Sequence, residues 1–177
     1  MMKLKILGVL CFAVAFATVS HAQTKVSGTV NCSKPDVAAS VDVGDVAGHS
    51  MALLKTTCNW TQPMEINGDH TKQDALVMSS ESWATRAVNN GDGVGTLDNG
   101  DKFYVTLHET ATMKDGQPVG AVHGTWVMKG LTGKVKGITG KGTYTSTPNA
   151  DGTSTATVEG EYSMPAAKPA AAKPATK

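Results

Sequence analysis

Residues 124–144 read GTWVMKGLTGKVKGITGKGTY and contain six glycines and four lysines. Such a run raises the question of a phosphate-binding loop. The template G-x-x-x-x-G-K-[ST] fails at two positions, because Gly142 stands where Ser or Thr belongs and Val135 replaces the first glycine. No helical pattern follows that could offer its N-terminus to a phosphate. We therefore interpret the run as part of a β-sheet.

The same run predicts two strands that coil sharply. Residues 130–133 form a turn in this interpretation, and the lysines that follow face solvent around an inward Val135. A β-bulge at Gly137 would reset the register of the second strand. Gly140 and Gly142 would then permit the local coiling that closure of a small barrel requires.

Short alternating runs dominate the chain after residue 22, and no stretch keeps a helical spacing of apolar residues. Asn99-Gly100 predicts a two-residue hairpin, because both central residues of a type I′ turn need positive φ. Asp115-Gly116 and residues 149–152 predict further turns, and residues 36–48 are expected to form a loop. The pattern favours an antiparallel sandwich or barrel, with strands in the opening run and at residues 25–31, 51–60, 75–80, 82–88, 94–97, 102–113, 119–128 and 154–163.

The run 124–144 resembles the pattern G-x-W-…-G-T-G-x-[LF]-x-G-[IA]-x-G-x-G of the allene oxide cyclase and dirigent protein superfamily of calycin-like barrels. It is more similar still to small exported bacterial proteins of uncharacterised function, which share that pattern and a closing E-G-E-Y, here residues 159–162. The resemblance covers about the last 80 residues of the body, and Leu131 stands where the pattern often has Gly. It implies a barrel with a cavity and carries over no catalytic residue. The predicted fold is all-β, a single antiparallel β-barrel of about eight strands.

The chain divides into three parts. Residues 1–22 have the layout of a secretory signal peptide, with Lys3 and Lys5, an apolar run and a small-x-small pattern before Gln23. A retained N-terminal anchor is the alternative, although the apolar run is shorter than the ~20 residues of a membrane span. The barrel domain is expected over residues 23–165, in the periplasm or secreted. Residues 166–177, rich in Ala, Lys and Pro, are predicted to be a disordered tail.

Charge and cysteine content restrict the partners and the compartment. Residues 23–165 hold 11 basic and 15 acidic residues, a balance that argues against a nucleic-acid binder. The tail adds three lysines and is either a weak contact with an anionic envelope polymer or a solvated end. Cys32 and Cys58 remain after signal cleavage. An oxidising compartment favours a disulfide between them, and two buried free thiols are the alternative.

Glu109, His108 and His123 are the candidate acid–base residues. Glu109 shares its strand parity with apolar positions 103, 105 and 107, so on an inward face it would be a buried carboxylate with a raised pKa and a possible general base. The alternative is that Glu109 lies at the frayed end of the strand, where its carboxylate is exposed to water. Pairing about the 115–116 turn would make His108 and His123 cross-strand neighbours, able to bind a metal or shuttle protons, or merely surface histidines.

Trp126, Tyr104 and Trp83 are the candidate ligand-binding aromatics, although barrel aromatics more often fill the core. No histidine has the spacing of a metal-binding motif, so no metal site and no cofactor are predicted. The functional prediction is non-catalytic binding of a small apolar molecule, or an envelope-associated role. The alternatives are a cofactor-free isomerase or cyclase that uses a cavity Glu or His, and a metal-binding module.

Overall fold

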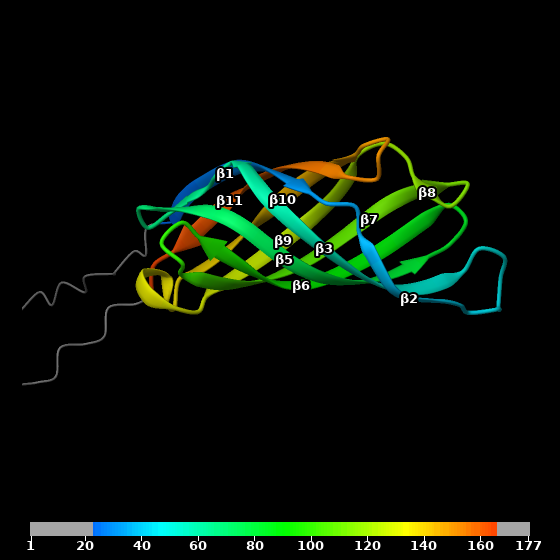
Figure 1. Cartoon of the computed structure of the whole chain (residues 1–177), viewed down its shortest axis with the longest axis horizontal. Helices are drawn as coiled ribbons and strands as arrows, with labels where there is room; N and C mark the ends of the chain where they lie inside the picture. The colour runs from blue at the N-terminus through cyan, green and yellow to red at the C-terminus, as the bar shows by residue number, and fades with distance from the viewer. Residues whose placement is uncertain (1–22, 166–177) are drawn as a thin grey trace, which may run out of the picture.

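The computed structural model describes residues 23–165, which form a closed antiparallel β-barrel of eight strands (Figure 1). The barrel strands are β1 (Gln23–Cys32), β3 (Ser50–Gln62), β5 (Asp69–Ser82), β6 (Arg86–Leu97), β7 (Lys102–Lys114), β9 (Val122–Gly130), β10 (Thr139–Pro148) and β11 (Ser154–Ser163). They follow the order β3-β1-β11-β10-β9-β7-β6-β5, and pairing of β5 with β3 closes the circle. The predicted fold class is confirmed.

Short elements lie at the two ends of the barrel. They are β2 (Asp36–Asp42), β4 (Glu65–Ile66), β8 (Gln117–Pro118) and the 3-10 turn η1 (Gly133–Val135). Within residues 23–165, no helix is long and apolar enough to cross a membrane. The predicted signal peptide and tail, residues 1–22 and 166–177, lie outside the described residues.

Several local predictions were wrong. Residues 36–48 are not all loop, because β2 pairs with the part of β3 that extends past β1. The predicted strand at 82–88 is interrupted by the turn at Trp83–Thr85, and β6 runs unbroken from Arg86 to Leu97. Gly137 forms no bulge; it has a φ of 82° in the turn that follows η1.

The hairpin between β6 and β7 also differs from the prediction. Gly100 has a φ of 86°, whereas Asn99 is not among the residues with positive φ. The Leu97 N–H donates to the Asp101 carbonyl over 2.8 Å, so the turn holds Asp98, Asn99 and Gly100. The connection is thus one residue longer than a two-residue hairpin, which shifts the register of the pair.

One end of the barrel is closed by side chains. Ile66, Leu97, Val135 and Ile138 are each at most 1% exposed and fill this end. Val135 faces inward, as predicted, but it lies in the η1 turn and not on a strand, because β10 begins only at Thr139. The Lys134 N–H donates to the Asp101 carboxylate over 2.9 Å. These four apolar side chains, which we call the plug, and this hydrogen bond together close this end of the barrel.

The glycines of β10 and β11 make room for a tryptophan. Trp126 is 4% exposed, and its Nε1 donates to the Glu159 carbonyl over 3.1 Å. Its indole lies over the cross-strand pair Gly142 and Gly160. A Cβ on Gly142 would come within 2.7 Å of the Trp126 ring, closer than carbon atoms tolerate. The glycine-rich run therefore permits close approach of an indole to the sheet.

A disulfide joins Cys32 and Cys58, as predicted. These residues are direct partners on β1 and β3, a pairing of four positions, whereas every other pair of neighbouring barrel strands matches at least eight. The covalent bond therefore reinforces the shortest seam of the barrel.

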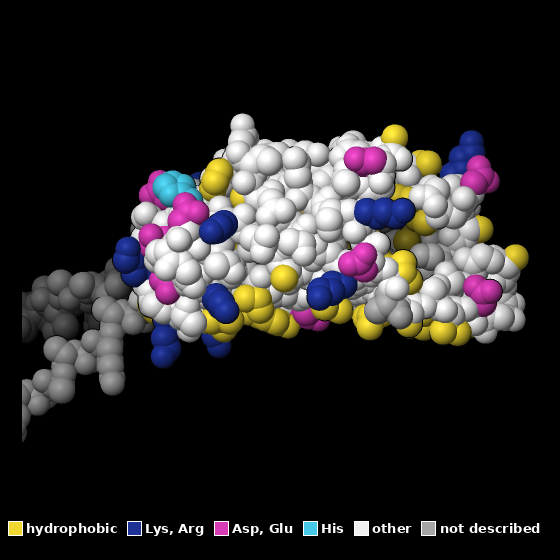
Figure 2. All heavy atoms as spheres, viewed as in Figure 1, with side chains coloured by type: hydrophobic (Ala, Val, Ile, Leu, Met, Phe, Trp, Pro, Cys, Tyr) yellow, Lys and Arg dark blue, Asp and Glu magenta, His cyan; other side chains and the backbone are white. Residues whose placement is uncertain are grey.

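The two ends of the barrel differ in what they present. Gln23 pairs with Ser163, so the first and last barrel strands begin and end side by side at the closed end. The opposite end carries β2, β8 and the turn between β10 and β11 (Figure 1). We call this second end the mouth. On the face shown in Figure 2, charged side chains of both signs are interspersed, and hydrophobic side chains gather along one side of that face.

Candidate functional site

A cavity of about 850 Å³ occupies the part of the barrel nearer the mouth and opens there. Eight strands enclose an interior wide enough for packed side chains or one small ligand. Near the mouth many inward positions carry small side chains that cannot fill this width, namely Ser80, Ser82, Ala87, Ala111, Ser146, Ser154 and Ala156. Deeper walls are apolar, with Val30, Leu54, Leu76, Met78, Val105, Leu107, Trp126, Met128 and Val158.

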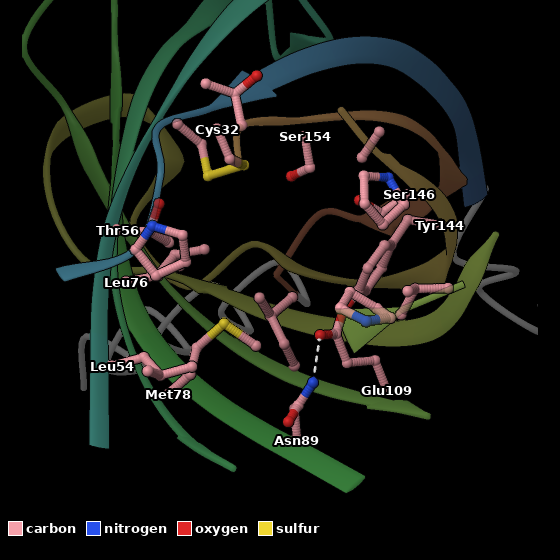
Figure 3. A pocket seen from close by; sticks show the side chains of 18 of the residues that line it. Cys32, Leu54, Thr56, Leu76, Met78, Asn89, Glu109, Tyr144, Ser146 and Ser154 are labelled. Atoms are coloured by element: carbon pink, nitrogen blue, oxygen red, sulfur yellow. Dashed lines mark hydrogen bonds between the residues drawn. A yellow bond between two sulfur atoms is a disulfide. The ribbon is translucent and has the colours of Figure 1, made fainter. Parts of the chain in front are cut away.

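Glu109 lies inside this cavity on β7, near Tyr144 and Asn89 (Figure 3), and both of its carboxylate oxygens accept hydrogen bonds. The Tyr144 hydroxyl donates to Oε2 over 2.6 Å, and Asn89 Nδ2 donates to Oε1 over 2.7 Å. Asn89 is the direct cross-strand partner of Glu109 on β6. We call these three residues the Glu109 cluster.

Tyr144 reaches Glu109 across an intervening strand. It pairs with Gly124, which in turn pairs with Glu109. A Cβ on Gly124 would lie 2.6 Å from the Tyr144 hydroxyl, so the phenol needs a glycine beneath it. Burial and the neighbouring Glu109 carboxylate raise the pKa of Tyr144 well above its usual range. Tyr144 therefore acts as a hydrogen-bond donor to Glu109 at any ordinary pH.

A second carboxylate lines the cavity on β5. Asp74 is 9% exposed, and its Oδ2 accepts a hydrogen bond from Trp60 Nε1 over 3.0 Å. Its Oδ1 is buried and has no hydrogen-bond partner within residues 23–165. Burial raises the pKa of Asp74 to about 7, and the Trp60 hydrogen bond opposes the shift only in part. The Asn89 Oδ1 is likewise buried without a partner in this part of the chain.

The structure separates the three acid–base candidates. Glu109 faces inward, the side that its parity allowed. His108 and His123 are exposed on the outer face, where His108 Nδ1 lies 2.8 Å from the Asn90 side chain and His123 Nδ1 lies 3.3 Å from Thr145. They lie on adjacent strands, β7 and β9, but diagonally, because His108 pairs with Thr125. Within residues 23–165, no group of three or more His, Cys, Asp or Glu side chains could hold a metal ion.

The three aromatic candidates are also dispersed. Trp126 lines the deep wall of the cavity. Tyr104 is 39% exposed on the outer face and donates its hydroxyl hydrogen to Asp92. Trp83 lies in the turn between β5 and β6, where its ring stacks on His49 with 4.8 Å between the ring centroids. The Arg86 guanidinium carbon lies 4.1 Å from the centroid of the Trp83 ring.

Sequence reasoning missed Asn89, Tyr144 and Asp74 as site residues. Asp74 shares its parity with the inward residues Leu76 and Met78, so strand alternation carried a usable signal. The contacts of Asn89 and Tyr144 with Glu109 depend on register across four strands, β6, β7, β9 and β10, which no local pattern encodes.

No family model, curated protein or solved structure gives a significant match to this chain.

Proposed function

We propose that this barrel binds a small apolar molecule in its cavity, in the periplasm or outside the cell. The observation that carries the proposal is the open cavity of about 850 Å³ with largely apolar walls. Ligand pockets of proteins are typically concave, mostly apolar and of roughly 300–1,000 Å³, with a few polar groups that orient the ligand. The Glu109 cluster and Asp74 supply such groups.

The methionines of the cavity favour an adaptable fit. Met64, Met78, Met113 and Met128 all line it. Their unbranched side chains rearrange at low cost and tolerate ligands of different outline. A rigid wall of branched side chains would select one shape more strictly.

Two further features support the compartment and the family. The Cys32–Cys58 disulfide is typical of proteins that fold in an oxidising environment, and residues 1–22 have the composition of an export signal. The resemblance of residues 124–144 to allene oxide cyclase and dirigent-like barrels supports a distant place in that superfamily. Fold likeness alone carries no activity, so the proposal rests on the cavity.

A matched pair of variants tests cavity binding. Ser146 faces inward beside Val122 and Ala156, whereas the next residue, Thr147, is exposed on the outer face. Ser146→Trp should fill the passage from the mouth and weaken binding of the neutral dye Nile red at least about tenfold. Thr147→Trp should leave it unchanged. Equal dye binding by both variants, or none by the wild type, would exclude the cavity as the binding site.

A cofactor-free isomerase or cyclase is the second candidate. The observation that favours it is the inward Glu109 carboxylate, held 2.6 Å from the Tyr144 hydroxyl. A carboxylate base in an apolar cavity suits proton removal next to a carbonyl group, and the Tyr144 hydroxyl can turn toward the substrate oxygen once Glu109 has taken up the proton. Such activity would exchange the α-hydrogens of a long-chain methyl ketone for deuterium in heavy water, as followed by NMR. Glu109→Gln should abolish this exchange and retain Nile red binding, and absence of exchange in the wild type would end this reading.

A further inference from the structure

We propose that the molecule bound in this cavity carries a cationic amine on its apolar body, and that the amine docks at the Glu109 cluster. This inference rests on the proposed function, since it names the class of ligand for the same cavity. It follows from two features of the cavity walls, the balance of hydrogen-bond donors and acceptors and the balance of charge.

Acceptors exceed donors at the Glu109 cluster. The one hydroxyl hydrogen of Tyr144 and one amide hydrogen of Asn89 are already directed at Glu109. The carboxylate has lone pairs to spare, and the Tyr144 oxygen can still accept. Asn89 Oδ1 is buried without a partner within residues 23–165. Its orientation is fixed, because the opposite amide orientation would turn Oδ1 toward the carboxylate. Because Asn89 Oδ1 is buried, a ligand in the cavity meets the remaining lone pairs of Glu109 and Tyr144, and it must donate hydrogen bonds to satisfy them.

Below the mouth, the ionisable side chains of the cavity wall are acidic. Glu109 and Asp74 line this wall, although burial raises the pKa of Asp74 to about 7, so that it is negative only above neutral pH. Among residues 23–165, the one basic side chain that lines the cavity is Lys34, which is exposed at the mouth, and no Arg or His of this part of the chain lines it. A carboxylate or phosphate ligand would meet no cation inside. An ammonium group offers three N–H donors and the opposite charge, so it complements both balances.

The apolar surroundings strengthen this pairing. Leu107 and Ala111 flank Glu109 on the same strand face, and Val122 and Trp126 line the neighbouring wall. Charges interact more strongly where water is excluded. Figure 3 shows Glu109 between Tyr144 and Asn89, with Leu54, Leu76 and Met78 across the cavity, where an apolar body would lie.

Three probes with one alkyl chain test the inference: decylamine, decanol and decanoate, each titrated by calorimetry below its micelle concentration. The wild type should bind decylamine about tenfold to a hundredfold more tightly than decanol, which is the ratio that a charge-assisted hydrogen bond supports, and decanoate least tightly. Glu109→Gln should remove most of the amine preference and leave decanol binding within about twofold. Glu159→Gln removes the same charge from an exposed outer position and should change nothing.

The outcomes distinguish the two proposals. Equal binding of the three probes by the wild type, preferred binding of decanoate, or an amine preference that survives in Glu109→Gln would overturn the cationic ligand and leave apolar binding standing. Failure of all three probes and of Nile red would reject the cavity function itself. Because the comparison of probes on the wild type needs no variant, the inference stays testable even if Glu109→Gln does not fold, which circular dichroism would show.

Discussion

Trp60 donates the hydrogen of its indole Nε1 to Asp74 Oδ2 over 3.0 Å, and within residues 23–165 the second oxygen of that carboxylate has no partner. An indole hydrogen bond alone does not offset the removal of a carboxylate from water. The pKa of Asp74 therefore rises from 3.8 to about 7, and the native protein holds a proton there that the unfolded chain releases.

The first prediction concerns the pH dependence of stability. Since the native pKa of Asp74 is raised, its protonation stabilises the fold at low pH, and that contribution is lost as pH rises from about 4 to about 7. The shift corresponds to about 4 kcal/mol above pH 7. Asp74→Asn keeps an oxygen for Trp60 and should stabilise the protein at pH 8 but not at pH 4, as measured by urea unfolding. Parallel pH profiles for variant and wild type would contradict this origin of the shift.

The second prediction concerns the indole on the sheet. A methyl group on Gly142 would meet the Trp126 ring and the backbone of β11, so Gly142→Ala should destabilise the fold by about 3 kcal/mol or more. Thr143→Ala, at the exposed neighbouring position, should cost much less. Thermal unfolding of the two variants makes the comparison, and a small effect of Gly142→Ala would mean that the indole can move aside.

The third prediction concerns the disulfide that joins β1 to β3. Removal of the Cys32–Cys58 bond by substitution of both residues with Ser should lower the free energy of unfolding by about 2–4 kcal/mol. Reduction of the wild type with dithiothreitol should produce the same loss, and the serine variant should not respond to the reductant. A reductant effect on the variant would point to another cause.

The fourth prediction concerns a histidine at the mouth end. His49 Nδ1 lies 2.6 Å from Asp45, and His49 Nε2 lies 3.0 Å from Glu81. The contact with Glu81 joins the loop before β3 to the end of β5. The hydrogen bond to Asp45, and secondarily that to Glu81, raises the pKa of His49 above 6.5. Protonated His49 therefore stabilises the fold fully below pH 6.5, and this stabilisation is lost as pH rises through the higher native pKa of His49. On the acid side, the hydrogen bond to His49 lowers the pKa of Asp45, so the stabilisation from ionised Asp45 is lost as pH falls below 3.8.

NMR titration of the His49 ring measures this effect directly. The wild-type midpoint should lie above 6.5, and Asp45→Asn should bring it down toward that value. If Asp45→Asn left the His49 midpoint unchanged, the hydrogen bond to Asp45 could not be the cause of the raised pKa.

The fold was predictable where alternation and turn residues agree. β7 alternates buried Phe103 and Val105 with exposed neighbours, and Asp115-Gly116 ends it with two positive φ values. β6 was harder to predict because Gly91, Gly93 and Gly95 occupy inward positions without side chains, so its apolar alternation disappears.

The site was predictable only in part. Strand parity placed Glu109 inside, but its partners depend on register. A two-residue turn at Asn99-Gly100 would have set Asn90 opposite Glu109, whereas the longer turn sets Asn89 there. Tyr144 lies two strands away and reaches Glu109 only because Gly124 leaves the space between them open. Such a contact is a property of the assembled wall rather than of any segment.

The adjacency of Gln23 and Ser163 at the closed end fixes how the protein can be attached to other things. A linker joined directly to Gln23 or Ser163 leaves the barrel beside the plug of apolar side chains, at the end opposite the mouth. Immobilised through such a linker on a bead or a sensor chip, the barrel would stand with its entrance toward the solution, so capture through that linker leaves ligand access unobstructed.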